Sequence, residues 1–273
     1  MRFEGGIWLQ FTEIDVSDLV VDVGMYSLPF YALCLFVIIL VRYLAVAGLA
    51  WGLVCARSSP LDQDVFQDIR LSIVSAAIFA IAMAAVIEIH LLGYTRIYDQ
   101  LGAYGWWYIG GSYLLVLVLQ DGFFYITHRL FHRPSFYSWA HQGHHRSRRP
   151  SPWTSFAFEP MESFAHAMFL IGVVCFIPLH LGTILAVLTT MTIWAVVNHL
   201  GLEQLPVRFP HHWLGRWIIG PAHHCVHHDQ QNKHFGLYFT FWDRLLGTED
   251  RAYTCRIKGR APSFPAQSPI VDG

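Results

Sequence analysis

The chain has 273 residues, of which 54% are hydrophobic and only 14% charged, and its formal net charge is −1. An ordinary soluble domain is less apolar and more highly charged, so we expect an integral membrane protein. The near-neutral charge gives no reason to expect a nucleic-acid partner. The five cysteines follow no CxxC spacing, and we expect no disulfide among them.

Three apolar runs predict transmembrane helices in the first half of the chain. Residues 28–54 and 71–92 each reach the roughly 20 residues that a bilayer crossing requires, and polar residues separate them. A third apolar helix is predicted from Trp106, and it continues without interruption to His132. Because Asp121 and the first histidines stand in its last part, we expect this helix to leave the membrane there.

The second half of the chain is less uniform. Residues 133–160 contain arginines and prolines that do not suit hydrocarbon, so we expect a surface segment. Residues 163–197 are apolar except around Pro178 and predict two short helices in a hairpin, which need not cross the membrane completely. From residue 198 onward the composition is mixed and basic, as in a compact region outside the membrane.

These elements predict an all-α integral membrane protein with about four transmembrane helices and a histidine-rich helical cap. We expect a single domain over residues 1–273, made of N-terminal helices (1–119), a histidine-bearing region (120–250) and a C-terminal tail (251–273). Positive residues mark the cytoplasmic side of a membrane, and they gather in residues 129–149 and in the C-terminal third. We therefore expect the histidines to face the cytoplasm, in a bacterial inner membrane or the endoplasmic reticulum.

Three groups of histidines have the spacing of metal ligands. They are His128 and His132, then His141, His144 and His145, and finally His224, His227 and His228. Members four residues apart share one face of a helix, so each such pair can present nitrogen to one ion. Neutral imidazole is the commonest metal-binding side chain, and the second and third groups have the same spacing. The pattern predicts two metal sites, or one site with two ions.

In this order and spacing, the eight histidines resemble the signature of the fatty acid hydroxylase and sterol desaturase superfamily of membrane di-iron enzymes. Residues 220–228 and 234–248 are similar to the C-terminal block of sterol C-5 desaturases (lathosterol oxidases), and residues 151–158 to the segment after their second histidine group. There are two departures. This chain has Glu159 where those proteins usually carry histidine, and a run ending in Glu203 replaces the aspartate that usually follows their lone helical histidine.

The resemblance implies an oxygen-dependent lipid oxidase with two iron ions, dioxygen as co-substrate and His199 as a ninth ligand. It also implies a sterol substrate, with C-5 desaturation or hydroxylation as the reaction. Oxidation of a fatty acyl or sphingoid lipid is the alternative. No redox domain is recognisable in the sequence, so we expect an external electron donor such as cytochrome b5 or a ferredoxin.

Ligand histidines need hydrogen-bond partners that fix their tautomer, and carboxylates often serve this role. We expect Asp243 to be such a partner, and an ion pair of Asp243 with Arg244 or Arg129 is the open alternative. Other candidates stand near the ligands in sequence, namely His223, His234 and Glu203.

Four other ionisable residues are interpreted as structural groups rather than as metal ligands. Glu162 and His166 stand one residue wider than the Glu-x-x-His spacing of soluble carboxylate di-iron bundles, so we leave them out of the candidate set. His90 and His180 stand alone near predicted helix ends. A histidine without companions is more often a packed or solvated group than a ligand, and we exclude both.

A non-redox membrane zinc protein is the alternative of another class, because imidazole binds zinc as readily as iron. Zinc catalysis typically uses three protein ligands per ion, which nine histidines exceed. We therefore prefer the oxidase.

Overall fold

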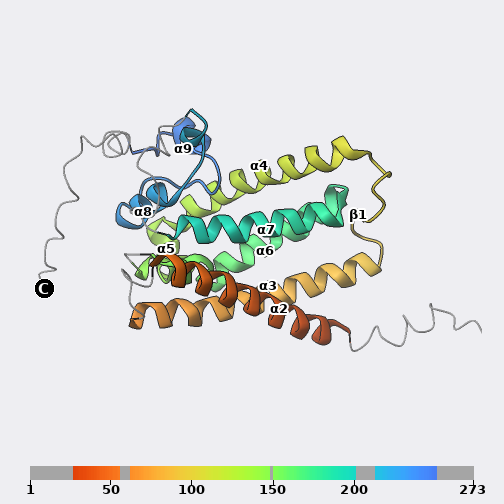
Figure 1. Ribbon diagram of the computed structural model, residues 1–273, viewed down its shortest axis with the longest axis horizontal. Coiled ribbons are helices and arrows are strands. Elements are labelled where there is room, and N and C mark those ends of the chain that lie inside the picture. Colours follow the sequence, from red (N-terminus) through yellow and green to blue (C-terminus); the bar gives the residue numbers. More distant parts are fainter. Residues whose placement is uncertain (1–26, 56–61, 148–149, 201–212, 251–273) are drawn as a thin grey trace, which may run out of the picture.

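The structure, a computed structural model, describes residues 27–55, 62–147, 150–200 and 213–250. In these ranges five long helices lie side by side (Figure 1): α2 (Ser27–Ala50), α3 (Gln63–Leu91), α4 (Trp106–Phe131), α6 (Pro160–Phe176) and α7 (Leu181–Asn198). α2 continues into a π-helical turn, Trp51–Cys55. Helices α2, α3, α4 and α7 are long and apolar enough to cross a membrane, whereas α6 is a shorter apolar helix. The predicted all-α membrane fold is confirmed.

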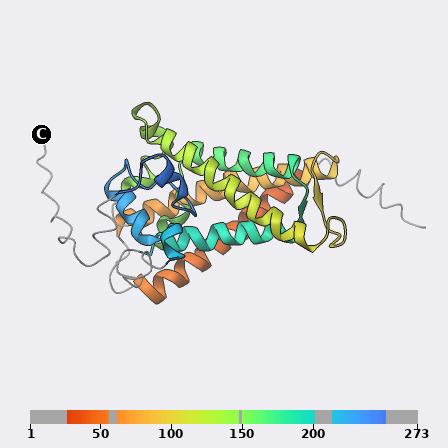
Figure 2. The ribbon, with the colours of Figure 1, turned by 90° about the horizontal axis from the view of Figure 1, so that it is seen from above.

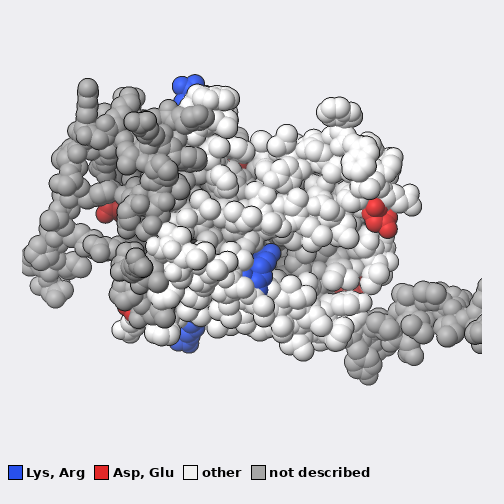
Figure 3. Space-filling model, in the orientation of Figure 1, with Lys and Arg blue, Asp and Glu red and all other residues white. Residues whose placement is uncertain are grey.

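The surface of the helices agrees with a membrane setting. Figure 3 shows few charged side chains over the middle of the described helices. Large apolar side chains such as Leu33, Ile38 and Leu114 are exposed there instead, each by at least 60%. Such residues suit hydrocarbon, which surrounds the middle of a transmembrane helix.

The short elements divide between the two ends of the long helices. One end, here called the histidine end, carries α5 (Pro134–Ala140), α8 (Pro221–Asp229), α9 (Phe241–Leu245) and short 3-10 turns (Figures 1 and 2). The other, here called the strand end, carries β1 (Ile97–Tyr98) and β2 (Leu179–His180). These two strands pair in parallel, with Ile97 opposite Leu179. The pairing joins the loop before α4 to the turn between α6 and α7.

Two hydrophobic cores hold the helices together, and α6 contributes to both. Buried Val116, Val173 and Val187 join α4, α6 and α7. Buried Phe79 and Ala167 belong to a second core that joins α2, α3 and α6. α6 therefore packs against α4 and α7 on one side and against α2 and α3 on the other.

Helix α3 begins at Gln63, earlier than the predicted residue 71. The side chain of Asp62 caps it by accepting a hydrogen bond from the backbone N–H of Val65 at 3.1 Å. Asp68 is buried within the helix, where its Oδ2 accepts hydrogen bonds from the hydroxyls of Ser147 (2.8 Å) and Thr154 (2.6 Å). Asp68 was expected in the polar connector but is part of the helix, where two hydroxyl partners satisfy its carboxylate.

The prediction of a surface segment over residues 133–160 is wrong for its second half. Trp153 and Phe156 pack against α2 and α3: the hydroxyl of Tyr43 donates to the carbonyl of Trp153 at 2.7 Å, and the ring of Phe156 stacks on Phe79. The arginines and prolines suggested exposure, but the segment also makes buried contacts, such as the hydrogen bond from the Thr154 hydroxyl to Asp68 of α3. This packing brings the second histidine group against the helices.

Candidate metal centre

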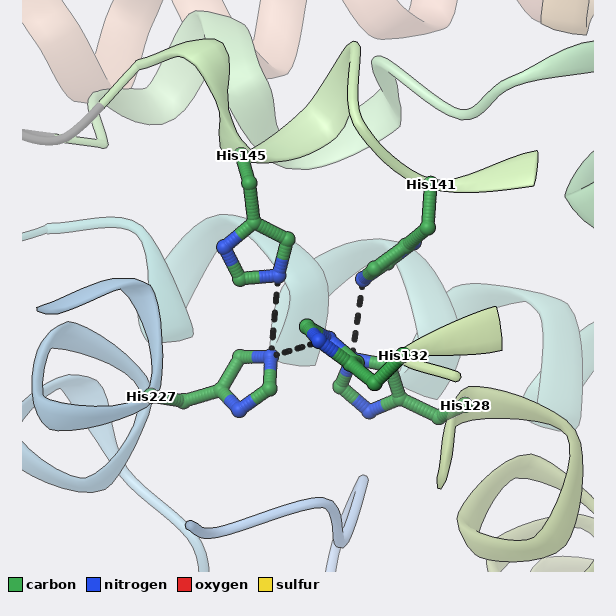
Figure 4. Close-up of side chains that lie close together, drawn as sticks. All are labelled: His128, His132, His141, His145 and His227. Atoms are coloured by element: carbon green, nitrogen blue, oxygen red, sulfur yellow. Dashed lines mark hydrogen bonds between the residues drawn. The ribbon is translucent and has the colours of Figure 1, made fainter. Parts of the chain in front are cut away.

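The nine predicted ligands come together at the histidine end in two adjoining clusters. The five-histidine cluster consists of His128, His132, His141, His145 and His227 (Figure 4). The four-histidine cluster consists of His144, His199, His224 and His228. Within each cluster, one ring nitrogen per residue lies within 4.8 Å of all the others. The ring centroids of His145 and His228, one from each cluster, are 4.6 Å apart.

Helix ends position most of these rings. His128 lies in the last turn of α4 and His132 is its C-cap, while His199 is the C-cap of α7. α8 carries the whole third group. The expected helix over the second group is absent, because α5 ends at Ala140 and a 3-10 turn follows at His144–Arg146. This prediction of a helix was wrong.

The spacing of the histidines nevertheless sorts them as predicted. Each pair four residues apart contributes to a single cluster: His128 with His132 and His141 with His145 to the five-histidine cluster, and His224 with His228 to the four-histidine cluster. Histidines adjacent in sequence belong to different clusters: His144 and His145 are separated in this way, and so are His227 and His228. The second and third groups therefore each supply both clusters.

The backbone fixes the tautomer of several rings. Nδ1 lies close to a carbonyl oxygen in His128 (Phe235, 3.0 Å), His144 (Ala157, 3.2 Å), His199 (Ala195, 2.6 Å) and His227 (Lys233, 2.6 Å). A carbonyl oxygen only accepts, so each of these Nδ1 atoms carries the proton and donates. In the neutral ring Nε2 then holds a free lone pair, which is what a metal ion requires.

Ring nitrogens of other histidines approach these lone pairs inside the clusters. The Nε2 atom of His227 lies 3.0 Å from Nε2 of His145 and 3.1 Å from Nε2 of His132 (Figure 4). The Nε2 atoms of His128 and His141 are 3.0 Å apart, as are those of His199 and His224. The carbonyl contacts leave His128 and His227 without a proton on Nε2, so each of these atoms can accept a hydrogen bond from the neighbouring ring or share a metal ion with it.

A metal ion held in each cluster would account for this geometry. Metal–imidazole bonds are about 2.1 Å long, so two ligands at right angles bring their nitrogens to about 3 Å from each other. The distances in both clusters match that separation. The chemistry of the donor set therefore fits one ion in each cluster.

Burial keeps the rings in the form that binds metal. It lowers the pKa of His141, His145, His224, His227 and His228 well below the usual value, because a charged imidazolium is poorly solvated there. For the same reason the pKa of His144 falls to about 4 and that of His199 to about 3. Near neutral pH these rings are uncharged and available as ligands.

Asp243 is placed differently from the prediction. Its carboxylate accepts from the backbone N–H groups of Phe235 (2.8 Å) and Gly236 (3.0 Å) and from the Thr248 hydroxyl (2.6 Å), rather than from a histidine ring. The alternative, an ion pair of Asp243 with a nearby arginine, is not observed among the described residues, where Arg244 pairs with Glu249. Asp243 affects the orientation of His128 indirectly, because it holds the loop whose Phe235 carbonyl accepts a hydrogen bond from His128.

The remaining candidates lie outside both clusters or outside the described residues. The rings of His223 and His234 neighbour each other, with centroids 5.1 Å apart. Nδ1 of His223 accepts from the backbone N–H of Gly220, and Nε2 of His234 accepts from that of Asp250. Glu203 falls within residues 201–212, which the structure does not describe.

Glu162 was missed as a partner of a ligand. Its Oε2 lies 2.9 Å from Nδ1 of His141, and both side chains are 1% exposed. A signal was present in the sequence, because a carboxylate directly before an apolar run needs a partner if it is buried. The partner itself could not be named, because it lies on another element.

Comparison with known proteins agrees with this centre. The fatty acid hydroxylase family model matches residues 113–248, which contain all nine candidate ligands. Similar proteins include the Delta(7)-sterol 5(6)-desaturase ERG3B of Gibberella zeae (29% identical, covering 69% of this chain and 57% of the relative) and the lathosterol oxidases of Homo sapiens (30%, 69% and 62%) and Rattus norvegicus (29%, 69% and 62%). The chain thus spans about three fifths of the length of these relatives. No solved structure matches it. The chain belongs to the fatty acid hydroxylase family.

Proposed function

We propose that the chain is an oxygen-dependent lipid oxidase that holds two iron ions through its nine clustered histidines. The observation that carries this proposal is the approach of imidazole nitrogens to about 3 Å from one another in two clusters, which fits two adjacent metal ions. The family match and the sterol-oxidising relatives support iron and dioxygen over other metal chemistry. A non-redox zinc protein remains the alternative of another class.

Iron bound there would supply the reduction of dioxygen that oxidation of a lipid C–H bond requires. The protein's own residues hold the ligand rings in fixed tautomers through backbone carbonyls and keep bulk water out of the buried clusters. Desaturation removes two hydrogens from the lipid and, with two electrons and two protons, converts dioxygen to two waters. Hydroxylation uses the same electrons and protons but places one oxygen atom in the lipid and releases one water.

The substrate that we propose is a sterol or a similar ring lipid, oxidised by C-5-type desaturation or by hydroxylation. The support is the similarity to sterol desaturases and lathosterol oxidases. The site lies at one end of apolar helices, so a lipid can keep its apolar body in the bilayer while one carbon reaches the clusters. A fatty acyl or sphingoid lipid is the second candidate, and the description of the matching family favours it.

Glu159 is the departure with a visible structural consequence. Its Oε1 accepts from the backbone N–H of Gly143 at 3.0 Å, directly before His144 in the chain. A Cβ on Gly143 would lie 2.3 Å from this oxygen, so the glycine permits the contact. We propose that Glu159 shapes the approach to the four-histidine cluster and so affects which carbon is presented.

An external donor such as cytochrome b5 or a ferredoxin would supply the electrons. We place its docking site on the histidine end, which we propose to face the cytoplasm. There a cavity of about 620 Å³ is lined by Arg70, Arg146 and Glu159 together with residues of α3. Both arginines are exposed, and their positive charge suits the acidic surface of such donors.

The test of function is expression in a host that lacks its own sterol C-5 desaturase, followed by mass spectrometry of the lipid extract. Loss of two hydrogens from a sterol, absent with His144→Ala, supports the sterol desaturase. Addition of oxygen to acyl chains with sterols untouched overturns the sterol assignment in favour of the second candidate.

Metal analysis separates the oxidase from the zinc protein. Freshly purified, active chain should contain two iron ions, and iron-free chain reloaded with zinc should lose oxidation. One ion or fewer in an active sample would contradict the proposal. Lipid oxidation that persists with zinc alone would contradict it as well.

A further inference from the structure

Glu162 lies between α6 and the second histidine group. Its Oε2 is 2.9 Å from Nδ1 of His141, and its Oε1 is 4.0 Å from Nε2 of His166. The Nε2 atom of His141 points into the five-histidine cluster, 3.0 Å from that of His128. The carboxylate therefore stands directly behind a proposed ligand, on the side away from the proposed ion.

In the part of the chain that the structure describes, no lysine or arginine forms an ion pair with Glu162. Among the described residues, its only ion-pair contacts within 4.0 Å are to the two histidines. The ring of His166 stacks on Phe124 with centroids 5.2 Å apart, so this side of the carboxylate is apolar. A buried carboxylate is costly unless a positive charge balances it. An ion on the far side of His141 provides that charge.

The two clusters differ in this respect. In the four-histidine cluster, Nδ1 of His144 and Nδ1 of His199 donate to neutral backbone carbonyls. In the five-histidine cluster, His128 and His227 also donate to carbonyls, but His141 has the carboxylate. A carboxylate partner makes the opposite ring nitrogen more basic than a carbonyl partner does.

We infer that Glu162 is a positioning residue for the five-histidine cluster. It fixes His141 in the tautomer whose Nε2 lone pair faces the cluster, and its negative charge strengthens retention of the ion bound there. The ion in the four-histidine cluster lies outside its direct influence. This inference rests on the proposed two-ion centre.

The test is a chelator titration of the purified full chain loaded with cobalt(II), with ions per chain measured by elemental analysis. Glu162→Gln keeps the size of the side chain and removes its charge. We expect one of the two ions to leave at a chelator concentration lower by 10- to 100-fold, on the order of the effect of other partners of metal ligands. Glu88→Gln is the matched control, because Glu88 lies on α3 near the strand end, and its release curve should equal that of the original chain.

Double variants identify which ion is affected. His199→Ala removes a ligand from the four-histidine cluster, so the remaining ion should report on the five-histidine cluster. Adding Glu162→Gln should shift the release of that ion and change its cobalt absorption spectrum. His132→Ala leaves the other ion, whose release and spectrum should not respond to Glu162→Gln.

The outcomes are distinct. An unchanged release curve for Glu162→Gln, or an equal shift in the release of both ions, overturns the role of Glu162. If the original chain still binds two ions in that case, the proposed function is unaffected. One ion or fewer in the original chain overturns both. If Glu162→Gln does not fold, Glu162→Asp replaces it: the charge is kept but the carboxylate is drawn back from His141, and a smaller shift of the same ion is expected. No shift with Glu162→Asp then counts against the inference.

Discussion

The histidine end and the strand end use the same side chain in opposite ways. At the strand end, Nδ1 of His180 accepts from the backbone N–H of Gly182 and its Nε2 lies 3.0 Å from the carbonyl oxygen of Asp99. Both nitrogens thus have protein partners, and the ring caps α7. At the histidine end, the carbonyl partners hold Nδ1 and leave Nε2 facing other rings. The position of the partner therefore decides whether a histidine caps a helix or can bind metal.

Buried carboxylates follow the same division. Asp121, Glu162 and Asp243 are all at most 1% exposed and lie in the half of the molecule that carries the histidines. Asp121 and Asp243 accept hydrogen bonds from the backbone of residues 235–239, next to α4 and α9. At the strand end, Tyr108 instead donates to the carbonyl of Pro178, a neutral pair. The buried carboxylates of the histidine end therefore hold the backbone of residues 235–239 and the ring of His141 in place.

The largest expected effect comes from His227→Ala. Nε2 of His227 contacts Nε2 of both His132 and His145, so its loss removes a ligand at the centre of the five-histidine cluster. We expect no measurable lipid oxidation and one iron ion instead of two, measured by product mass spectrometry and elemental analysis. His180→Ala is the control and should keep both ions. Equal metal loss in the two variants would break the distinction between the two ends.

Asp121→Ala should be the next most damaging change. Oδ1 of Asp121 accepts from the backbone N–H groups of Leu237 (3.0 Å) and Tyr238 (2.7 Å), which would be left unpaired. We expect a loss of about 3 kcal/mol in the free energy of unfolding, measured by denaturation in detergent. Ser112→Ala on the same helix loses only a bond to its own turn, so its effect should be much smaller. Similar losses for both variants would contradict a special role for Asp121.

Arg146→Glu tests the charge of the histidine end. Arg146 lies on the cavity proposed for the electron donor, and reversing its charge should repel an acidic donor. We expect the KM for the donor to rise by about tenfold at low ionic strength, with a smaller difference at high salt, because ions screen exposed charges. Arg96→Glu, an exposed arginine near β1, should leave this KM unchanged. A rise in both variants would argue against donor docking at the histidine end.

His180→Ala should have the smallest effect. The variant loses an N-cap and the contact to Asp99, so the free energy of unfolding should fall by about 1 kcal/mol. Iron content and lipid oxidation should stay at their original levels. A fall in iron content would mean that the strand end contributes to the metal centre.

The fold and the proposed ligand set could be predicted largely from the sequence. Apolar runs reveal membrane helices because hydrocarbon excludes charge over a fixed length. Pairs of histidines four residues apart, such as His128 with His132, indicate candidate ligands because the helix itself brings them together. Both signals are local in the sequence.

The carboxylate contacts that failed prediction join different elements of the structure. Asp68 lies within helix α3 instead of in a connector, and its partners Ser147 and Thr154 are far along the chain. Asp243, on α9, accepts a hydrogen bond from the backbone of the loop before that helix. Glu162, on α6, contacts His141. In each case the partner of a carboxylate depends on how separate elements pack, which spacing does not encode.

Because α8 is short and carries three candidate ligands, natural variants should tolerate few insertions or deletions within it. Within one turn this helix gives His224 and His228 to one cluster and His227 to the other, so its pitch sets the register between the two clusters. One residue inserted between His224 and His227 would rotate the later rings by about 100° and turn them away from both clusters. Insertions in connections without ligands carry no such penalty. Relatives should therefore differ in the length of their loops while the third histidine group stays fixed in length.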